Sequence, residues 1–150
     1  MHLNDATVSY VTEFAHNAAL VAVVVFLHRV MANRFSGPAE SALSGLLFGG
    51  GAVLSMMAAI AAWDGVIFDA RTVVLSVGAL FGGPVVAAIS ATIAAAYRIY
   101  LGGQGTVVGV LVIATATAAG LVLRHRYARD FLTVNVWLFL ALGLVVHVTA

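Results

Sequence analysis

Two arginines, Arg71 and Arg98, flank an uncharged stretch of an otherwise apolar chain, residues 72–97. An arginine inside a membrane is costly, about 2.5–3.5 kcal/mol at the centre of a helix, so such residues are functional candidates. Two guanidinium groups on neighbouring helices could hold a carboxylate or phosphate through paired hydrogen bonds. We therefore interpret the pair as a candidate anion site. The alternative is that Arg71 pairs with Asp69 or Asp64 and that Arg98 reaches the lipid headgroups.

The composition indicates that these arginines belong to a membrane protein. Hydrophobic residues make up 63% of the chain and charged residues 9%, and the mean hydropathy is +1.08. Soluble domains have about 45–50% apolar and about 25% charged residues. Since one crossing takes about 20 apolar residues, we expect an all-α integral membrane protein, a bundle of about six transmembrane helices within the lipid bilayer.

Several classes of function are excluded by what the sequence lacks. All seven basic residues are arginine and the net charge is only +1, which argues against a nucleic-acid partner. Without cysteine there is no thiol catalysis and no thiolate metal site, and the five histidines are dispersed, so we expect no metal and no cofactor. No nucleophile elbow, phosphate loop or carboxylate pair occurs, and we expect no enzyme activity.

The apolar segments set the expected order of spans. A polar loop over residues 28–40 is expected after the first span. Small residues at Gly45 and in the Gly49–Gly51 run would let the second span approach its neighbours closely. The last apolar segment is still in progress at Ala150, so we expect a truncated chain with an output domain downstream. The expected segments cover residues 8–31, 41–63, 72–97, 106–123 and 131–150.

The third segment contains a break. Gly82-Gly83-Pro84 interrupts it, and we predict two short helices that form a broken hairpin there, which would bring Arg71 and Arg98 to one surface. The positive-inside rule favours this arrangement with the N-terminus outside, in a multi-pass protein of the bacterial inner membrane. Two arginines then face outward and five are cytoplasmic, namely Arg29, Arg34, Arg124, Arg126 and Arg129.

Further polar residues near the expected outer surface are candidates for the same cavity. Glu13, His16 and Asn17 share one face of the first helix, where they line the cavity or form an interhelical hydrogen-bond cluster. His28 and His125 are expected to lie at the cytoplasmic interface. The loop over residues 102–105 is expected to form a tight re-entry at the membrane surface.

Three separated motifs carry a family resemblance: FDAR at 68–71, LFGGP at 80–84 and YRIYLGGQG at 97–105. Over about residues 40–125 the chain resembles the LytS/YhcK-type five-transmembrane sensor domain, 5TMR-LYT. The resemblance implies a bacterial receptor domain that precedes a histidine kinase or a diguanylate cyclase, and we expect a homodimer through that parent protein.

The same resemblance implies a ligand and its contacts. Some members recognise small carboxylates such as pyruvate through arginines at the positions of Arg71 and Arg98. The family also uses small polar or thiol side chains in the span after the Gly-Gly loop, where this chain has Thr115 and Thr117 but no cysteine, which leaves the identity of the ligand open. The predicted ligand-binding residues are Arg71, Arg98, Asp69, Gly102, Gly103, Thr115, His16 and Asn17.

Two other functions compete with the receptor. Broken helices also occur where transporters bind solutes, so the domain could be a solute-binding transporter subunit. A passive anchor and dimerisation unit, with structural arginines, is the third possibility. The coding sequence after Ala150 discriminates the first two, because a kinase or cyclase module would indicate signalling.

Overall fold

The computed structural model describes residues 2–60 and 70–127, and within these ranges it is all α-helix and turns. Each of the four helices contains a stretch long and apolar enough to cross a membrane. This supports the all-α membrane prediction. The expected count of about six spans stays a prediction, because segment 131–150 lies outside the described residues. The helices are α1 (His2–Arg34), α2 (Pro38–Ile60), α3 (Arg71–Leu101) and α4 (Thr106–Tyr127).

The connection between α1 and α2 is shorter than the predicted loop over residues 28–40. That prediction is wrong, because α1 continues to Arg34 and only residues 35–37 lie between the helices. A basic last turn in α1 and Glu40 in the first turn of α2 both suit the helix dipoles. The chain turns at Gly37, whose φ of 71° favours glycine, and Pro38 then begins α2.

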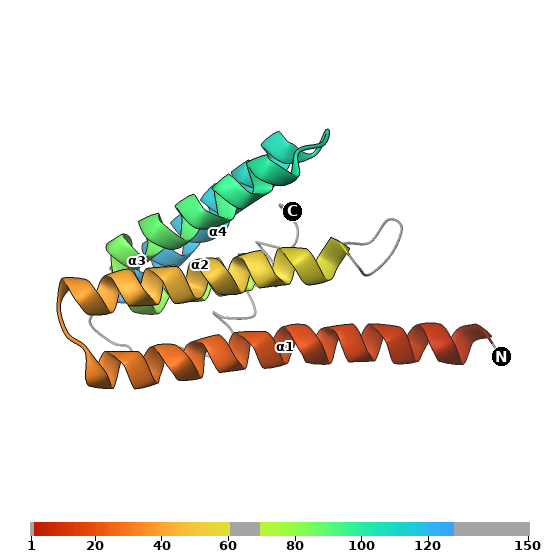
Figure 1. Ribbon diagram of the computed structural model, residues 1–150, viewed down its shortest axis with the longest axis horizontal. Helices are drawn as coiled ribbons and strands as arrows, with labels where there is room; N and C mark the ends of the chain where they lie inside the picture. Colours follow the sequence, from red (N-terminus) through yellow and green to blue (C-terminus); the bar gives the residue numbers. More distant parts are fainter. Residues whose placement is uncertain (1, 61–69, 128–150) are drawn as a thin grey trace.

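Helices α1 and α2 pack antiparallel (Figure 1). A Cβ on Gly51 would lie 2.9 Å from Val24, and the Nδ1 atom of His28 lies 2.9 Å from the Ser44 hydroxyl. The residue numbers of the contacting pairs thus increase along α1 while they decrease along α2. The N-terminal part of α1 projects beyond the Ile60 end of α2 (Figure 1).

Helix α3 is interrupted inside the Gly82-Gly83-Pro84 motif. Gly83 has a φ of 82° and a ψ of −168°, which is far from helical geometry, and Pro84 follows it. A proline has no amide hydrogen to donate within a helix, and a positive φ is open mainly to glycine. The two residues together therefore end one helical half, residues 71–82, and begin another, residues 84–101.

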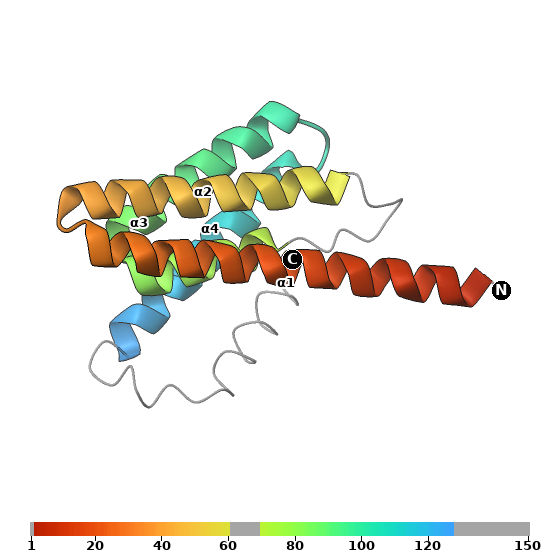
Figure 2. The ribbon, with the colours of Figure 1, turned by 60° about the horizontal axis from the view of Figure 1, so that its bottom comes forward.

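The two halves of α3 run in opposite directions along α2. Along the first half, the residue numbers contacted on α2 decrease: Arg71 reaches Met56, Val74 lies beside Gly51, and Gly78 lies under Phe48. Along the second half, the residue numbers contacted on α2 increase, since Ile89 packs on Gly45 and Ile93 packs on Gly49. Figure 2 shows the halves meeting at the end of the bundle that holds the α1–α2 connection.

Helix α4 completes the bundle against both halves. Gly109 lies against Arg98 of the second half, and Gly120 lies against the Ser76 carbonyl and Ala79 of the first half. Close approach at Gly45, Gly49 and Gly120 leaves no room for a larger side chain, as small-residue membrane interfaces require. The largest fully buried apolar side chains come from α2, α3 and α4: Phe48, Val74, Leu75, Val86 and Ile113.

Candidate functional site

Arg71 begins the first half of α3 and reaches back to α2. Its Nη1 atom lies 3.6 Å from the Met56 sulfur, and the side chain is half-buried. The preceding residue, Ala70, is buried. The guanidinium is therefore held against the Ile60 end of α2. Asp69 and Asp64, its predicted partners, lie outside the described residues.

Arg98 lies near the end of the second half, against Gly105, which precedes α4, and Gly109, which lies in α4. A Cβ on Gly105 would lie 3.0 Å from Nη2 of Arg98, and one on Gly109 would lie 2.9 Å from its Cδ. The Nη1 atom donates to the Gly102 carbonyl at 3.5 Å. Gly105 and Gly109 thus make room for this side chain, a role that the prediction missed although their GxxxG spacing is a signal for close helix packing.

The loop beside Arg98 is a helix-ending turn. Gly102 and Gly103 have φ values of 67° and 89°, and the Gly102 amide donates to the carbonyls of Arg98 and Ile99. The Thr106 hydroxyl then donates to the Gly103 carbonyl at 2.8 Å, which begins α4. The two glycines are therefore adjacent to Arg98, while their amide and carbonyl groups also serve to end one helix and start the next.

Arg71 and Arg98 lie at the same end of the bundle. Arg71 contacts Met56 of α2. Ile93 contacts Gly49 of α2, and Arg98 lies five residues further along the same half of α3, level with about residue 54 of α2. At the usual helical rise the two arginines differ by about 3 Å in level along α2. Arg71 contacts Met56 of α2, and Arg98 contacts Gly109 of α4.

The predicted residues on α1 lie at this end too. Val24 of α1 contacts Gly51 of α2. Because the two helices are antiparallel, Asn17, seven residues before Val24, lies level with about residue 58 of α2, within about 3 Å of the level of Met56. His16 is exposed and Asn17 is half-buried. Helix α1 packs mainly on α2 and has little contact with α3. The structure thus brings His16 and Asn17 to the end of the bundle that holds the two arginines.

Thr115 lies further along α4. Its hydroxyl donates to the Val112 carbonyl of its own helix, and the side chain is exposed. Six residues separate it from Gly109, about 9 Å along the helix axis and away from Arg98. Thr117 is buried and bonds to the Ile113 carbonyl. A ligand role for Thr115 stays a prediction.

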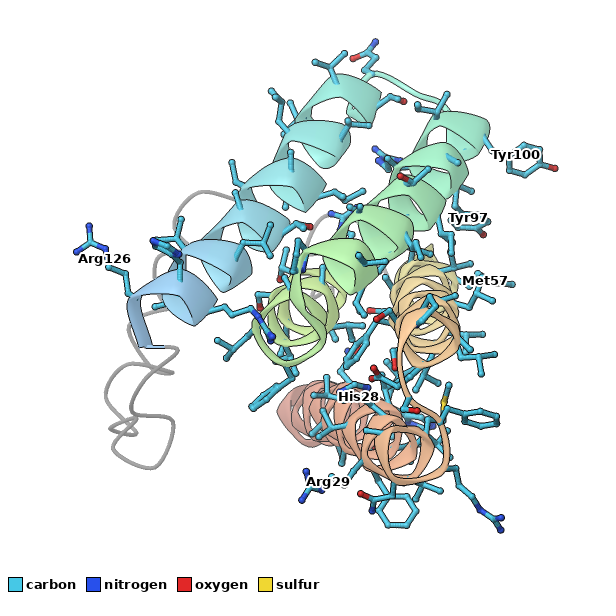
Figure 3. The ribbon with its side chains drawn as sticks, turned by 90° about the vertical axis from the view of Figure 1, so that its left-hand side faces the viewer. His28, Arg29, Met57, Tyr97, Tyr100 and Arg126 are labelled. Atoms are coloured by element: carbon cyan, nitrogen blue, oxygen red, sulfur yellow. The ribbon has the colours of Figure 1, made fainter. Side chains whose placement is uncertain are left out.

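His28 is not simply an interface residue. It is half-buried between α1 and α2, where its Nδ1 lies 2.9 Å from the Ser44 hydroxyl and its ring centroid lies 5.3 Å from that of Phe48. Ser44 in turn donates to Glu40 at 3.5 Å. Figure 3 shows His28 directed toward α2 while Arg29 points outward. The chain of hydrogen bonds links α1 to α2 at the Pro38 end.

Arg124 also has a structural contact that the prediction missed. Its Nη1 donates to the carbonyls of Leu80 and Phe81, both at 2.9 Å, just before the break in α3. Arg126, two residues later, is exposed and points away from the bundle (Figure 3). Nothing in the local sequence near Arg124 distinguishes it from Arg126. The signal lies 40 residues earlier, in the missing amide hydrogen of Pro84.

Within residues 2–60 and 70–127, no cluster of three or more metal-binding side chains occurs. Residues 24–150 match the family model described as 5TMR of 5TMR-LYT. The chain belongs to the 5TMR-LYT family. This confirms the family prediction and makes the molecule a multi-pass membrane sensor domain of a non-catalytic family. Comparison with curated proteins and with solved structures gave no match.

Proposed function

We propose that this 5TMR-LYT domain binds a small extracytoplasmic carboxylate, of the pyruvate type, between Arg71 and Arg98. It relays binding to a histidine kinase or diguanylate cyclase module of the parent protein, which we expect to be a homodimer. The observation that carries this proposal is the placement of both arginines at one level of one end of the bundle. A carboxylate offers two oxygens, which two guanidinium forks can share.

The contacts of the arginines differ in a way that supports this assignment. Arg124 donates two hydrogen bonds of 2.9 Å to main-chain carbonyls, whereas the contact of Arg98 with Gly102 is 3.5 Å long, at the limit for a hydrogen bond. An anion would therefore offer Arg98 a better acceptor than the Gly102 carbonyl.

The proposed topology places this site outside the cell. The two halves of α3 form a hairpin that enters and leaves the membrane at one face. The described arginines at the Pro38 end of the bundle are Arg29, Arg34, Arg124 and Arg126, and those at the other end are Arg71 and Arg98. Because arginines accumulate on the cytoplasmic side, the Pro38 end is cytoplasmic and the N-terminus of α1 is outside.

Signal relay then needs two packing states that the ligand distinguishes. Drawing Arg71 and Arg98 toward one carboxylate would shift the two halves of α3 relative to each other. The glycine contacts of Gly45 and Gly49 with the second half, and of Gly120 with the first, are the surfaces on which such small helix shifts occur.

Titration of the purified domain with pyruvate tests the proposal. Losing one charge-assisted hydrogen-bond donor costs about 1.5–3 kcal/mol, so Arg71→Gln and Arg98→Gln should each weaken binding about 10- to 100-fold. Arg126→Gln, an exposed arginine at the opposite end, is the matched control and should bind as the wild type does. Equal thermal stabilisation by pyruvate in the wild type and in the Arg71→Gln, Arg98→Gln double variant would contradict the proposal.

A solute-binding transporter subunit is the alternative that the interrupted α3 favours, since discontinuous helices are common in transporters. Proteoliposomes distinguish the two functions. Accumulation of labelled pyruvate inside vesicles would support transport, whereas saturable binding without accumulation would support the receptor.

A further inference from the structure

The break in α3 leaves a main-chain carbonyl that the helix itself cannot satisfy. The Leu80 carbonyl would ordinarily accept from the amide four residues later, but that residue is Pro84, which has no amide hydrogen. At Gly83 the chain turns away with a φ of 82°, which ends this helical half shortly after Leu80 and Phe81. In a membrane each unsatisfied polar group of this kind is strongly unfavourable.

Arg124 supplies a donor for the Leu80 carbonyl from another helix. Its Nη1 donates to the carbonyls of Leu80 and Phe81, and its guanidinium carbon would lie 3.2 Å from a Cβ on Gly83. Leu80 and Gly83 are buried and Arg124 is half-buried. The cation therefore covers the negative end of the first half of α3, where the helix dipole also favours a positive charge.

The contact of Arg124 with α3 lies at the opposite end of the bundle from Arg71 and Arg98. The proximity of Arg71 to Arg98 nevertheless depends on the break in α3. Along one straight helix the two arginines would be about 40 Å apart. With the reversal at Gly83 they share one level. Whatever holds the reversal therefore holds the two arginines together.

We propose that Arg124 is a positioning residue that stabilises the reversal in α3 and links it to the last turn of α4. The part of this proposal that concerns ligand affinity rests on the proposed function. The part that concerns the reversal does not. Opening of the Arg124 contact would let the two halves of α3 separate and would lower the fraction of molecules able to bind with both Arg71 and Arg98.

Spin-label distance measurement tests the reversal without any ligand. The chain has no cysteine, so Val73→Cys and Ile99→Cys, exposed positions on the two halves, can be labelled in the full chain in lipid nanodiscs. We expect a narrow distance distribution with Arg124 present and a broader, longer one in Arg124→Met. Arg126→Met is the matched control and should keep the narrow distribution. An unchanged distribution in Arg124→Met would overturn the proposal.

Two further variants keep the test decisive. If Arg124→Met does not fold, Arg124→Leu, which also lacks a donor hydrogen, is measured in the same way, and an unchanged distribution there overturns the proposal. Arg124→Lys keeps the charge and donor hydrogens and should restore most of the narrow population. A lysine variant as disturbed as the methionine variant, in a folded protein, would also refute the carbonyl-donor role.

Pyruvate titration then separates the two proposals. If the competent fraction falls to about one tenth, Arg124→Met should bind pyruvate about tenfold more weakly although it does not touch the ligand. The Arg71→Gln, Arg98→Gln double variant should lose pyruvate binding but keep the narrow distribution. If the wild type binds no pyruvate, the proposed ligand is wrong while the spin-label result still decides the role of Arg124.

Discussion

Substituting alanine for Gly109 should weaken ligand binding while leaving the fold almost unchanged. Gly109 packs against the Arg98 side chain, and an added Cβ would overlap Nε and lie 2.9 Å from Cδ and 3.0 Å from Cγ of that arginine. Ordinary carbon contacts begin near 3.4 Å, so Arg98 must shift by at least about 0.5 Å. The charge of the site is unchanged, and only the position of the guanidinium is altered.

Two opposing terms set the expected stability. A helical glycine replaced by alanine gains about 0.5–1 kcal/mol, while overpacking costs about 1–3 kcal/mol. The overpacking cost should fall at the low end, because the obstructing group is a flexible side chain. Stability should therefore change by less than about 1 kcal/mol. If the shift removes one charge-assisted hydrogen bond to the carboxylate, binding weakens about 10- to 100-fold.

Calorimetric titration with pyruvate and thermal unfolding without ligand measure these two quantities separately. Gly50→Ala is the control, because no atom lies within 4 Å of its added Cβ and it should bind pyruvate normally. The reasoning is refuted if folded Gly109→Ala binds pyruvate as tightly as Gly50→Ala does.

Three further predictions concern the packing that holds the site. Gly120→Ala would place a Cβ 2.8 Å from that of Ala79 and against a rigid main-chain carbonyl, so it should destabilise the domain by about 1–3 kcal/mol in detergent unfolding, whereas Gly50→Ala should not. Gly83→Ala should lose about 1–3 kcal/mol, because its φ is 82° and the Cβ would meet the Arg124 guanidinium; stability equal to the wild type would contradict the break. His28→Ala and Ser44→Ala should show a coupling of about 0.6 kcal/mol in a double-mutant cycle, and additive effects would mean that their hydrogen bond contributes nothing.

Features that depend on neighbouring residues in the chain could be predicted. The interruption in α3 falls inside the Gly82-Gly83-Pro84 motif, because proline and a positive-φ glycine act locally. The beginning of α4 at Thr106 was also predicted, since the preceding glycine-rich loop ends one helix before another starts. Close packing at Gly45 and Gly49 followed from residue size.

Features that depend on how helices align could not be predicted. The contact of His28 with Ser44 joins residues 16 apart, and that of Arg124 with Leu80 joins residues 44 apart. Both depend on the relative position of two packed helices, which no local pattern encodes. The predicted polar loop from His28 was wrong for a related reason, because polar residues at a membrane surface continue a helix as readily as they end it.

The position of the break within the membrane explains why an arginine, and not water, donates hydrogen bonds to the carbonyls at the break. The first half of α3, residues 71–82, is about 18 Å long at the usual helical rise, while the hydrocarbon layer is about 30 Å thick. If Arg71 lies at the outer surface, as access to an extracytoplasmic ligand requires, the Leu80 and Phe81 carbonyls end short of the opposite surface. Water is scarce there, whereas a long arginine side chain three residues before the end of α4 can reach inward. The same geometry makes the contact sensitive to helix movement, because any lengthening or sliding of the first half moves its carbonyls relative to Arg124.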